Sequence, residues 1–235
     1  MQRKTEIWII GIFVLVIAVV TVIAIFYSSS TSAPIPFTAT TVPALTSADW
    51  TRGDATSTVS VIEYGDFECP ACGAYEPIVE QLTSEYGNRV LFAFRNFPLY
   101  QIHPFAMIAA QAAEAAGLQG KYWEMHDLLY QKQAEWTANT SLSTSDVISK
   151  YFNVYATTLG LNVTKFDTDI NSGVVTAKVQ KDLASGNAAQ VDHTPTFFVN
   201  LTQIANPQSA AAFQNVIEAA LASSTVSTGS PQAAQ

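Results

Sequence analysis

The stretch Val59-Ser60-Val61-Ile62-Glu63-Tyr64, followed closely by Cys69-Pro70-Ala71-Cys72, decides the fold of this 235-residue chain. The first run is apolar and strand-like, and the run from Ala74 to Tyr86 after the cysteines is helix-like. A C-x-x-C pair between a strand and a helix is typical of a redox site in an α/β domain. The chain contains no other cysteine, so any cysteine chemistry depends on this pair.

The position of the two thiols predicts different roles for them. Residues three positions apart on the first turn of a helix lie close enough to form a disulfide. A thiol at the helix start faces unpaired backbone N–H groups and the positive end of the helix dipole, which favour the thiolate. Pro70 suits this first turn because its missing N–H would have no partner there. We expect Cys69 to be the exposed, low-pKa nucleophile and Cys72 the more buried resolving thiol.

Three other roles for the cysteines fit the sequence less well. A zinc site would need partners from His103, His126 and His193, which show no metal-like local spacing. Inert core thiols do not suit an exposed helix start. A structural disulfide would close a loop too short to constrain the unfolded chain much. We therefore expect no metal site and no cofactor.

The N-terminal region predicts a membrane anchor. Residues 7–27 are an uncharged run of 21 residues, which is long enough to cross a bilayer as a helix. Arg3 and Lys4 precede it, so residues 1–6 should stay cytoplasmic and the remainder should lie outside. A cleaved signal peptide is the alternative, although its apolar core usually spans only about 7–15 residues. We expect a single-pass cell-membrane protein with an extracytoplasmic catalytic domain.

The remainder divides into three parts. Residues 28–48 are rich in Ser, Thr, Ala and Pro and predict a flexible linker. Residues 49–222 are enough for one domain with a proper core, and residues 223–235 predict a disordered tail. The net charge of −8 argues against a nucleic-acid partner.

The domain itself predicts an α/β fold. The strand and helix around the cysteines lead to a second strand near residues 89–95. A helical block follows over residues 104–185, and a strand at 196–199 leads to a last helix at about 207–222. This order favours an α/β sheet that carries a helical insertion.

Several segments together resemble a known family. They are residues 63–72 around the cysteines, Arg95-Asn96-Phe97-Pro98-Leu99, His103-Pro104, residues 110–127, and Thr194-Pro195-Thr196-Phe197-Phe198-Val199-Asn200. In order and content they resemble the DsbA-type thiol:disulfide oxidoreductases, most of all the membrane-anchored BdbD-like branch. The resemblance implies a thioredoxin fold with an inserted α-helical subdomain, preceded by one N-terminal transmembrane helix.

The resemblance also implies roles for further residues. Thr194 and Pro195 match the family's catalytic cis-proline loop, although on general grounds only about 5–6% of X-Pro bonds are cis. Glu63 matches a buried acid beneath the cysteines that exchanges a proton with Cys72. The alternative for Glu63 is a solvent-facing residue on an edge strand.

The sequence departs from the family pattern at sites that tune the thiolate. Pro70 and Ala71 lie between the cysteines, and Ala71 stands where strongly oxidising members often carry histidine. His193 stands where glycine is frequent, and either stabilises the thiolate or caps a loop. Asn200-Leu201-Thr202 replaces a glycine-bearing turn, which predicts an irregular hairpin.

The leading hypothesis is a monomeric dithiol oxidase that introduces disulfides into unfolded or reduced secreted proteins. A quinone-linked membrane partner, similar to DsbB or VKOR, would restore the Cys69–Cys72 disulfide. The alternatives are a reductase or isomerase on the same fold, and a non-catalytic, chaperone-like peptide-binding module. His103 and His126 are interpreted as packing or hydrogen-bonding residues.

Overall fold

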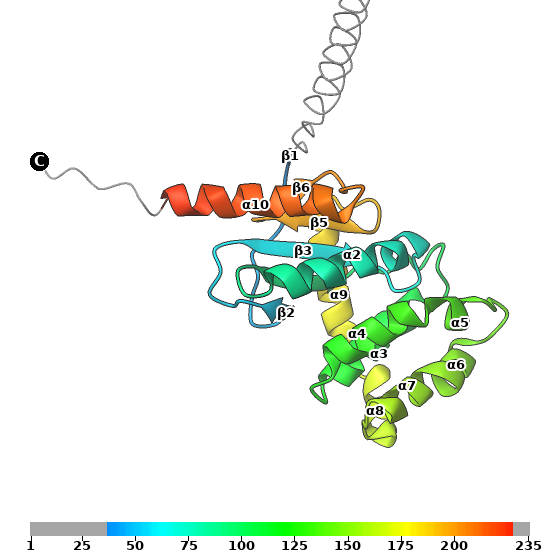
Figure 1. Cartoon of the computed structure of the whole chain (residues 1–235). Coiled ribbons are helices and arrows are strands. Elements are labelled where there is room, and N and C mark those ends of the chain that lie inside the picture. Colours follow the sequence, from blue (N-terminus) through cyan, green and yellow to red (C-terminus); the bar gives the residue numbers. More distant parts are fainter. Residues whose placement is uncertain (1–36, 228–235) are drawn as a thin grey trace, which may run out of the picture. The chain divides into compact units, whose positions relative to one another are not determined.

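The computed structural model describes residues 37–227, which form a six-stranded sheet, helices on both of its faces and a helical insertion (Figure 1). The membrane anchor expected at residues 7–27 lies outside the described residues. Within residues 37–227, no helix combines the length and hydropathy that a membrane crossing requires.

The sheet has the strand order β1-β6-β5-β3-β4-β2. The strands are β1 (Phe37–Thr41), β2 (Trp50–Gly53), β3 (Ser60–Gly65), β4 (Leu91–Asn96), β5 (Thr196–Val199) and β6 (Thr202–Ile204). Strands β3 and β4 are parallel and are joined by helix α2 (Pro70–Tyr86), whereas the other pairs are antiparallel. This arrangement confirms the predicted thioredoxin-like α/β fold.

The alternation of side chains along β3 determines on which face of the sheet Glu63 lies. Val61 belongs to a core shared with α2 and α10 (Ala210–Ser227), whereas Ile62 and Tyr64 pack on the other face, against residues at and after the end of α9 (Gly173–Ala188). Successive residues of a strand point to opposite faces. Glu63 therefore shares the face of Val61 and lies beneath α2, which begins at the cysteines.

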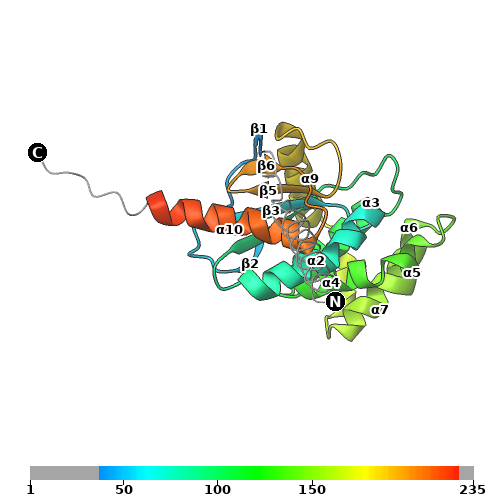
Figure 2. The same cartoon turned by 45° about the horizontal axis from the view of Figure 1, so that its top comes forward.

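The structure contains the expected helical insertion, and its helices begin at Ala106. It contains α3 (Ala106–Gly117), α4 (Tyr122–Gln131), α5 (Gln133–Thr137), α6 (Thr144–Val147), the π-helical turn η1 (Ile148–Phe152), α7 (Asn153–Thr158) and α8 (Val163–Ile170), and α9 returns to the sheet. Figures 1 and 2 show these helices at the opposite end of the domain from β1 and β6. Their buried core includes Trp136, Phe152 and Phe166, and it continues to Cys69 and Cys72.

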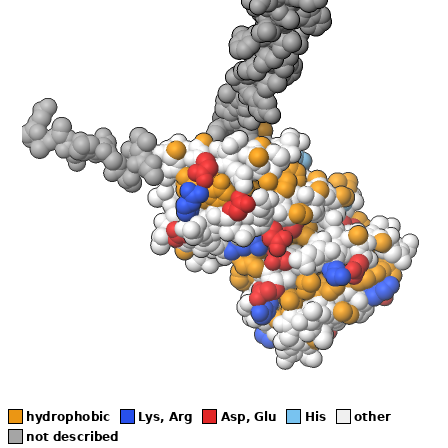
Figure 3. Space-filling view, in the orientation of Figure 1, with side chains coloured by type: hydrophobic (Ala, Val, Ile, Leu, Met, Phe, Trp, Pro, Cys, Tyr) orange, Lys and Arg blue, Asp and Glu red, His pale blue; other side chains and the backbone are white. Residues whose placement is uncertain are grey.

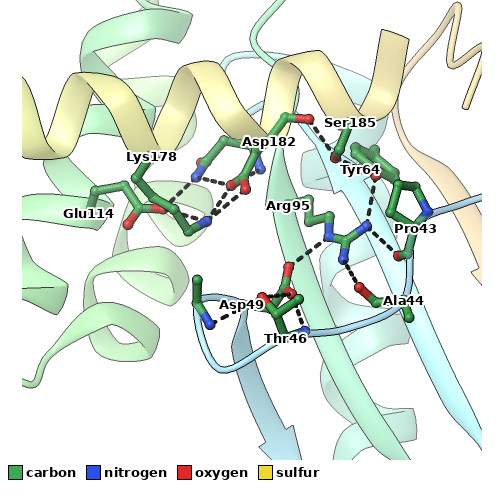
Figure 4. A network of polar contacts seen from close by, with 12 residues as sticks. Pro43, Ala44, Thr46, Asp49, Tyr64, Arg95, Glu114, Lys178, Asp182 and Ser185 are labelled. Carbon is green, nitrogen blue, oxygen red and sulfur yellow. Dashed lines mark hydrogen bonds and ion pairs between the residues drawn. The ribbon is translucent and has the colours of Figure 1, made fainter. Parts of the chain in front are cut away.

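The flexible linker predicted over residues 28–48 is wrong for its described part. Residues 37–41 form strand β1, which pairs with β6. Arg95 on β4 donates hydrogen bonds to the carbonyl groups of Pro43 (3.0 Å) and Ala44 (3.2 Å) and pairs with Asp49 (2.7 Å; Figure 4). The buried Arg95 side chain thus fixes residues 43–49, although the composition of this segment is too polar to form a core of its own.

The C-terminal elements also differ from the predictions. Helix α10 continues to Ser227, so the tail predicted from residue 223 is wrong over its first residues. The hairpin between β5 and β6 is tight rather than irregular, because Asn200 (φ 47°) and Leu201 (φ 67°) form a two-residue turn between the paired Val199 and Thr202. Two positive φ values match the twist of a hairpin, although leucine adopts this conformation at a cost of about 1–2 kcal/mol.

Candidate active site

The two cysteines lie where strand β3 gives way to helix α2. Cys69 is the N-cap of α2, with Pro70 at its first position. Both thiols are free and lie 3.8 Å apart. The pair is therefore reduced in this structure, because the sulfurs of a disulfide bond lie about 2.05 Å apart.

The surroundings of the two thiols shift their pKa values in opposite directions. The pKa of Cys69 is lowered to about 5, chiefly by a hydrogen bond from the Cys72 thiol and further by the Thr194 side chain and the first backbone N–H groups of α2, against the cost of burial. Burial raises the pKa of Cys72 well above its ordinary value, and the neighbouring Cys69 and Glu63 raise it further. At neutral pH the pair therefore holds one thiolate and one thiol.

The cis-proline loop covers Cys69. The Thr194–Pro195 peptide bond is cis, as the resemblance implied, and the Thr194 carbonyl oxygen lies 3.5 Å from Cys69 Sγ. Cys69 is only 7% exposed and Cys72 1%. The expectation of an exposed Cys69 is wrong because this loop lies against the sulfur. The Thr194 hydroxyl is buried and makes no hydrogen bond to the other described residues, so it is free to donate to the Cys69 thiolate once that group ionises.

Glu63 is a buried acid beneath the cysteines. It is 4% exposed, so a solvent-facing position on the sheet is excluded. Burial raises its pKa to about 8, Cys69 adds to the rise, and Arg52 opposes it. A carboxyl group with this pKa can both give and accept a proton near neutral pH.

The other tuning residues lie at the rim. Pro70 begins α2 and Ala71 contributes a backbone N–H to the Cys69 sulfur. His193 is exposed, and its ring pairs with Asp192 at 2.6 Å. Its carbonyl accepts a hydrogen bond from the Thr196 hydroxyl, so the described contacts of His193 are those of a loop residue.

Asp66 is a site residue that the sequence reasoning missed. Its backbone N–H points at Cys72 Sγ (3.5 Å). Its buried carboxylate accepts hydrogen bonds from the backbone of Glu68 and Leu99 and pairs with His103 at 2.7 Å. Asp66 and His103 therefore tie the loop after β4 to the cysteine segment.

Gln133 was missed as well. Its side-chain amide, on α5 of the insertion, donates hydrogen bonds to the carbonyl groups of Phe67 (2.8 Å) and Cys69 (2.9 Å). A Cβ at Gly73 would meet this side chain at 2.5 Å. The insertion thus holds the backbone on which the nucleophile stands.

Replacing Gln133 with alanine is expected to lower the free energy of unfolding by about 1–3 kcal/mol, because the two carbonyl groups lose their donor. Thermal unfolding of the full chain measures the effect. Gln131→Ala, at an exposed position at the end of α4, is the matched control. Equal melting temperatures for the two variants would contradict this role of Gln133.

A second polar cluster lies beside Glu63. Glu76, His126 and Asp127 place ligand atoms within 4.8 Å of one another, a spacing that could suit a metal ion. However, Arg52 lies 3.9 Å from the Glu76 carboxyl group and 3.4 Å from that of Asp127. This fixed positive charge occupies the same cluster and repels a cation, so these residues do not fit a metal site.

Glu76 is predicted to make the protein less stable as pH rises. Burial, and then the charge of Glu63, raise the pKa of Glu76 to about 9. An acid whose pKa is raised by folding contributes stability that is fully present below its unfolded pKa and is lost as pH rises through the folded value. For Glu76 the window runs from about pH 4.5 to about pH 9. Glu76→Gln should therefore flatten this loss and unfold at a higher temperature than the wild type at about pH 9.

The measurement is thermal unfolding across this window. The oxidised protein is used because Cys69, which acts in the opposite direction, then does not titrate. Glu85→Gln, exposed near the end of α2, is the control. An unchanged slope in Glu76→Gln would show that Glu76 is not the group responsible.

A comparison with known protein families identifies the family of this chain. The thioredoxin family profile, described as "Thioredoxin", matches residues 46–219. The chain therefore belongs to the thioredoxin family.

Solved structures share the fold of this chain. The structure is similar to Wolbachia pipientis α-DsbA1, with a TM-score of 0.68 and 20% identity over 78% of this chain and 96% of that chain. It is similar to oxidised BdbD from Bacillus subtilis, with a TM-score of 0.66 and 21% identity over 78% of this chain and 97% of that chain. These likenesses confirm the resemblance in fold to DsbA- and BdbD-type thiol:disulfide oxidoreductases.

The curated proteins with the most similar sequences include several named as Na⁺/H⁺ antiporters. The chain is 40% identical over 159 residues to a Na⁺/H⁺ antiporter NhaA 1 of Salinispora arenicola, which covers 68% of this chain and 22% of that protein. It is 37% identical to NhaA 3 of Salinispora tropica, over 77% of this chain and 26% of that protein. The chain thus spans about a quarter of the length of these relatives.

Proposed function

We propose that this protein is a protein thiol:disulfide oxidoreductase that works as a dithiol oxidase. The observation that carries the proposal is the difference between the pKa values of the two thiols. Cys69 has a pKa of about 5, whereas the pKa of Cys72 is raised. A stabilised Cys69 thiolate stabilises the reduced enzyme, and this makes its disulfide a stronger oxidant.

The proposed reaction moves two electrons from the substrate to the enzyme. A substrate thiolate attacks Cys69 Sγ of the Cys69–Cys72 disulfide and forms a mixed disulfide, and Cys72 leaves as a thiolate that takes a proton from Glu63. A second substrate thiolate then attacks the substrate sulfur and releases Cys69 as a thiolate. The substrate ends with a disulfide and the enzyme with two reduced cysteines.

Substrates of this reaction would be unfolded or reduced secreted proteins. The loop that Asp66 and His103 hold exposes Tyr100 (52%) and Ile102 (71%), which offer apolar contact to an unfolded chain. Figure 3 shows further hydrophobic side chains exposed among acidic and basic ones on one face of the domain.

The proposal includes a membrane tether through residues 7–27 and a catalytic domain outside the cytoplasm. A membrane reoxidant linked to quinone would then restore the disulfide. The uncharged run of residues 7–27 and the basic Arg3 and Lys4 before it support this setting. Ion transport is not proposed for this chain, because it matches about a quarter of their length.

The test is the reduction potential of the Cys69–Cys72 pair, measured by equilibrating the full chain in glutathione buffers. A value near about −120 mV would place the protein with the oxidants, and a value near about −270 mV would place it with thioredoxin-like reductants and overturn the assigned direction. Cys69→Ser should abolish the exchange completely. Undiminished cellular activity of Cys69→Ser would instead support a peptide-binding module.

A further inference from the structure

His126 lies at the centre of the insertion's contact with the active site, and its surroundings are unusual for a histidine. It is 1% exposed and stands on α4 within a cage of aromatic rings whose centroids lie 4.7–5.4 Å from its own. The cage consists of Phe67, Phe94, Trp123 and Tyr130. An apolar side chain would fill such a cage without burying polar nitrogen atoms.

The two ring nitrogens of His126 face different surroundings. Nδ1 lies 2.9 Å from the Asp127 carboxylate, whose pKa is lowered by His126 and Arg52 against the cost of burial. Because the ionised carboxylate can only accept, Nδ1 carries the proton of the neutral ring. Nε2 then bears the lone pair, and it is buried without a hydrogen-bond partner in the described part of the chain.

One small cavity is lined by both this histidine and the active-site acid. Glu63, His126 and Arg52 all line it, together with apolar side chains from the sheet and α2. Its volume of about 10 Å³ gives room for about one water molecule. On the far side of the ring, the Asp127 side chain is 34% exposed and reaches solvent.

We propose that His126 and Asp127 form a proton-transfer route between Glu63 and solvent, a role that rests on the thiol exchange proposed above. In this role they act through Glu63 and do not touch the reacting sulfurs. The route passes through the helical insertion, so the inserted subdomain supplies part of the proton chemistry as well as positioning the cysteines through Gln133.

The route balances the protons of each half-reaction. When the reduced enzyme closes its disulfide, Cys72–SH gives its proton to the Glu63 carboxylate and attacks the mixed disulfide at Cys69. Glu63 then passes the proton across the cavity to Nε2 of His126, and the ring releases its Nδ1 proton to Asp127 and solvent. When the disulfide opens, the same steps run in reverse and deliver one proton to the Cys72 thiolate.

The charges around His126 decide where the proton rests. Burial lowers the pKa of His126, and the charge of Arg52 from β2 lowers it further, so both disfavour a lasting imidazolium. Asp127 opposes both effects. The Glu76 carboxyl group from α2 lies 3.9 Å from Nδ1. Its pKa is about 9, so it is neutral at pH 7. Tyr130 is neutral as well, because burial raises its pKa. The ring therefore passes a proton on and does not store it.

The test isolates the step in which Cys72 loses its proton. The reduced full chain is mixed with oxidised glutathione at saturating concentration, and the release of glutathione from the mixed disulfide at Cys69 is followed against pH in H₂O and in D₂O. His126→Phe keeps the aromatic packing and removes both nitrogens. It is expected to slow this step by about tenfold and to change the solvent isotope effect.

Asp127→Asn provides a second variant at a partly exposed position, with an expected slowing of about threefold. Glu124→Gln, on the same helix in an exposed pair with Lys121, is the control and should match the wild type. Wild-type pH–rate profiles and isotope effects in a folded His126→Phe would overturn the route. If His126→Phe does not fold, an unchanged profile of Asp127→Asn overturns it. A wild-type protein that never exchanges with glutathione would instead refute the proposed function itself.

Discussion

Replacing Lys178 with methionine is expected to lower the free energy of unfolding by about 3–5 kcal/mol, because the change leaves buried carboxylates without their cation. The Lys178 ammonium on α9 lies 2.6 Å from the Asp182 carboxylate and 3.5 Å from that of Glu114 (Figure 4). The side chains of both acids are only 4% exposed. Asn96 and Trp50 also donate hydrogen bonds to these carboxylates, but they supply no charge.

The loss should depend on pH. Burial raises the pKa of Glu114 to about 7 even beside Lys178, and burial also raises the pKa of Asp182. Without the ammonium, both acids can take up a proton in acid solution and escape part of the penalty. The destabilisation is therefore expected to grow as pH rises through about 7.

Thermal unfolding of the full chain measures this prediction. For a domain of this size each kcal/mol corresponds to about 2–4 °C in Tm, so a fall of roughly 6–20 °C is expected. Lys121→Met is the control, because Lys121 pairs with Glu124 on the surface, where both side chains are more than 40% exposed. An exposed pair contributes about 0–1 kcal/mol. Equal Tm values for the two variants would show that Lys178 does not neutralise the buried acids.

The parts of the site that could be predicted from the sequence depend on local geometry. The order strand, C-x-x-C, helix places Cys69 at a helix start, and the structure has it at the N-cap of α2. The resemblance singled out Glu63, and the alternation along β3 explains why it lies under α2. One further signal was available: Cys72, Glu76 and Val79 share one face of α2 and are all buried, so helical periodicity alone would have placed Glu76 in the core.

The parts that could not be predicted depend on contacts between distant segments. Arg95 fixes residues 43–49 from about 50 positions away along the chain, and nothing in the Ser-, Thr- and Pro-rich composition of that segment indicates a partner. Gln133 reaches the Cys69 carbonyl across 64 positions. A polar side chain that satisfies a distant backbone group leaves no periodic pattern, so only the folded topology shows it.

Cys69 is expected to react with an alkylating reagent through a thiolate that titrates near pH 5. Cys72, with a raised pKa and 1% exposure, should remain unmodified in the folded protein. At pH 7 Cys69 is almost fully ionised, while a thiol with a pKa of 9.0 or above is ionised to about 1% or less. The two cysteines should therefore differ in reactivity by at least about a hundredfold, since the thiolate is the nucleophile. Mass spectrometry of the reduced full chain after iodoacetamide treatment measures both sites at each pH.

Two variants separate the causes of this low pKa. Cys72→Ala removes the largest stabilising hydrogen bond to the thiolate, and Thr194→Val removes a smaller one. Both should move the alkylation midpoint of Cys69 to higher pH, and Cys72→Ala should move it further. The same thiolate also stabilises the reduced fold. Because the pKa of Cys69 is lowered by folding, this contribution is fully present above about pH 9 and is lost as pH falls through about 5. An alkylation midpoint of Cys72→Ala equal to that of the wild type would contradict this account. The low pKa of Cys69 would then come from the helix N-terminus and not from the hydrogen bond with Cys72.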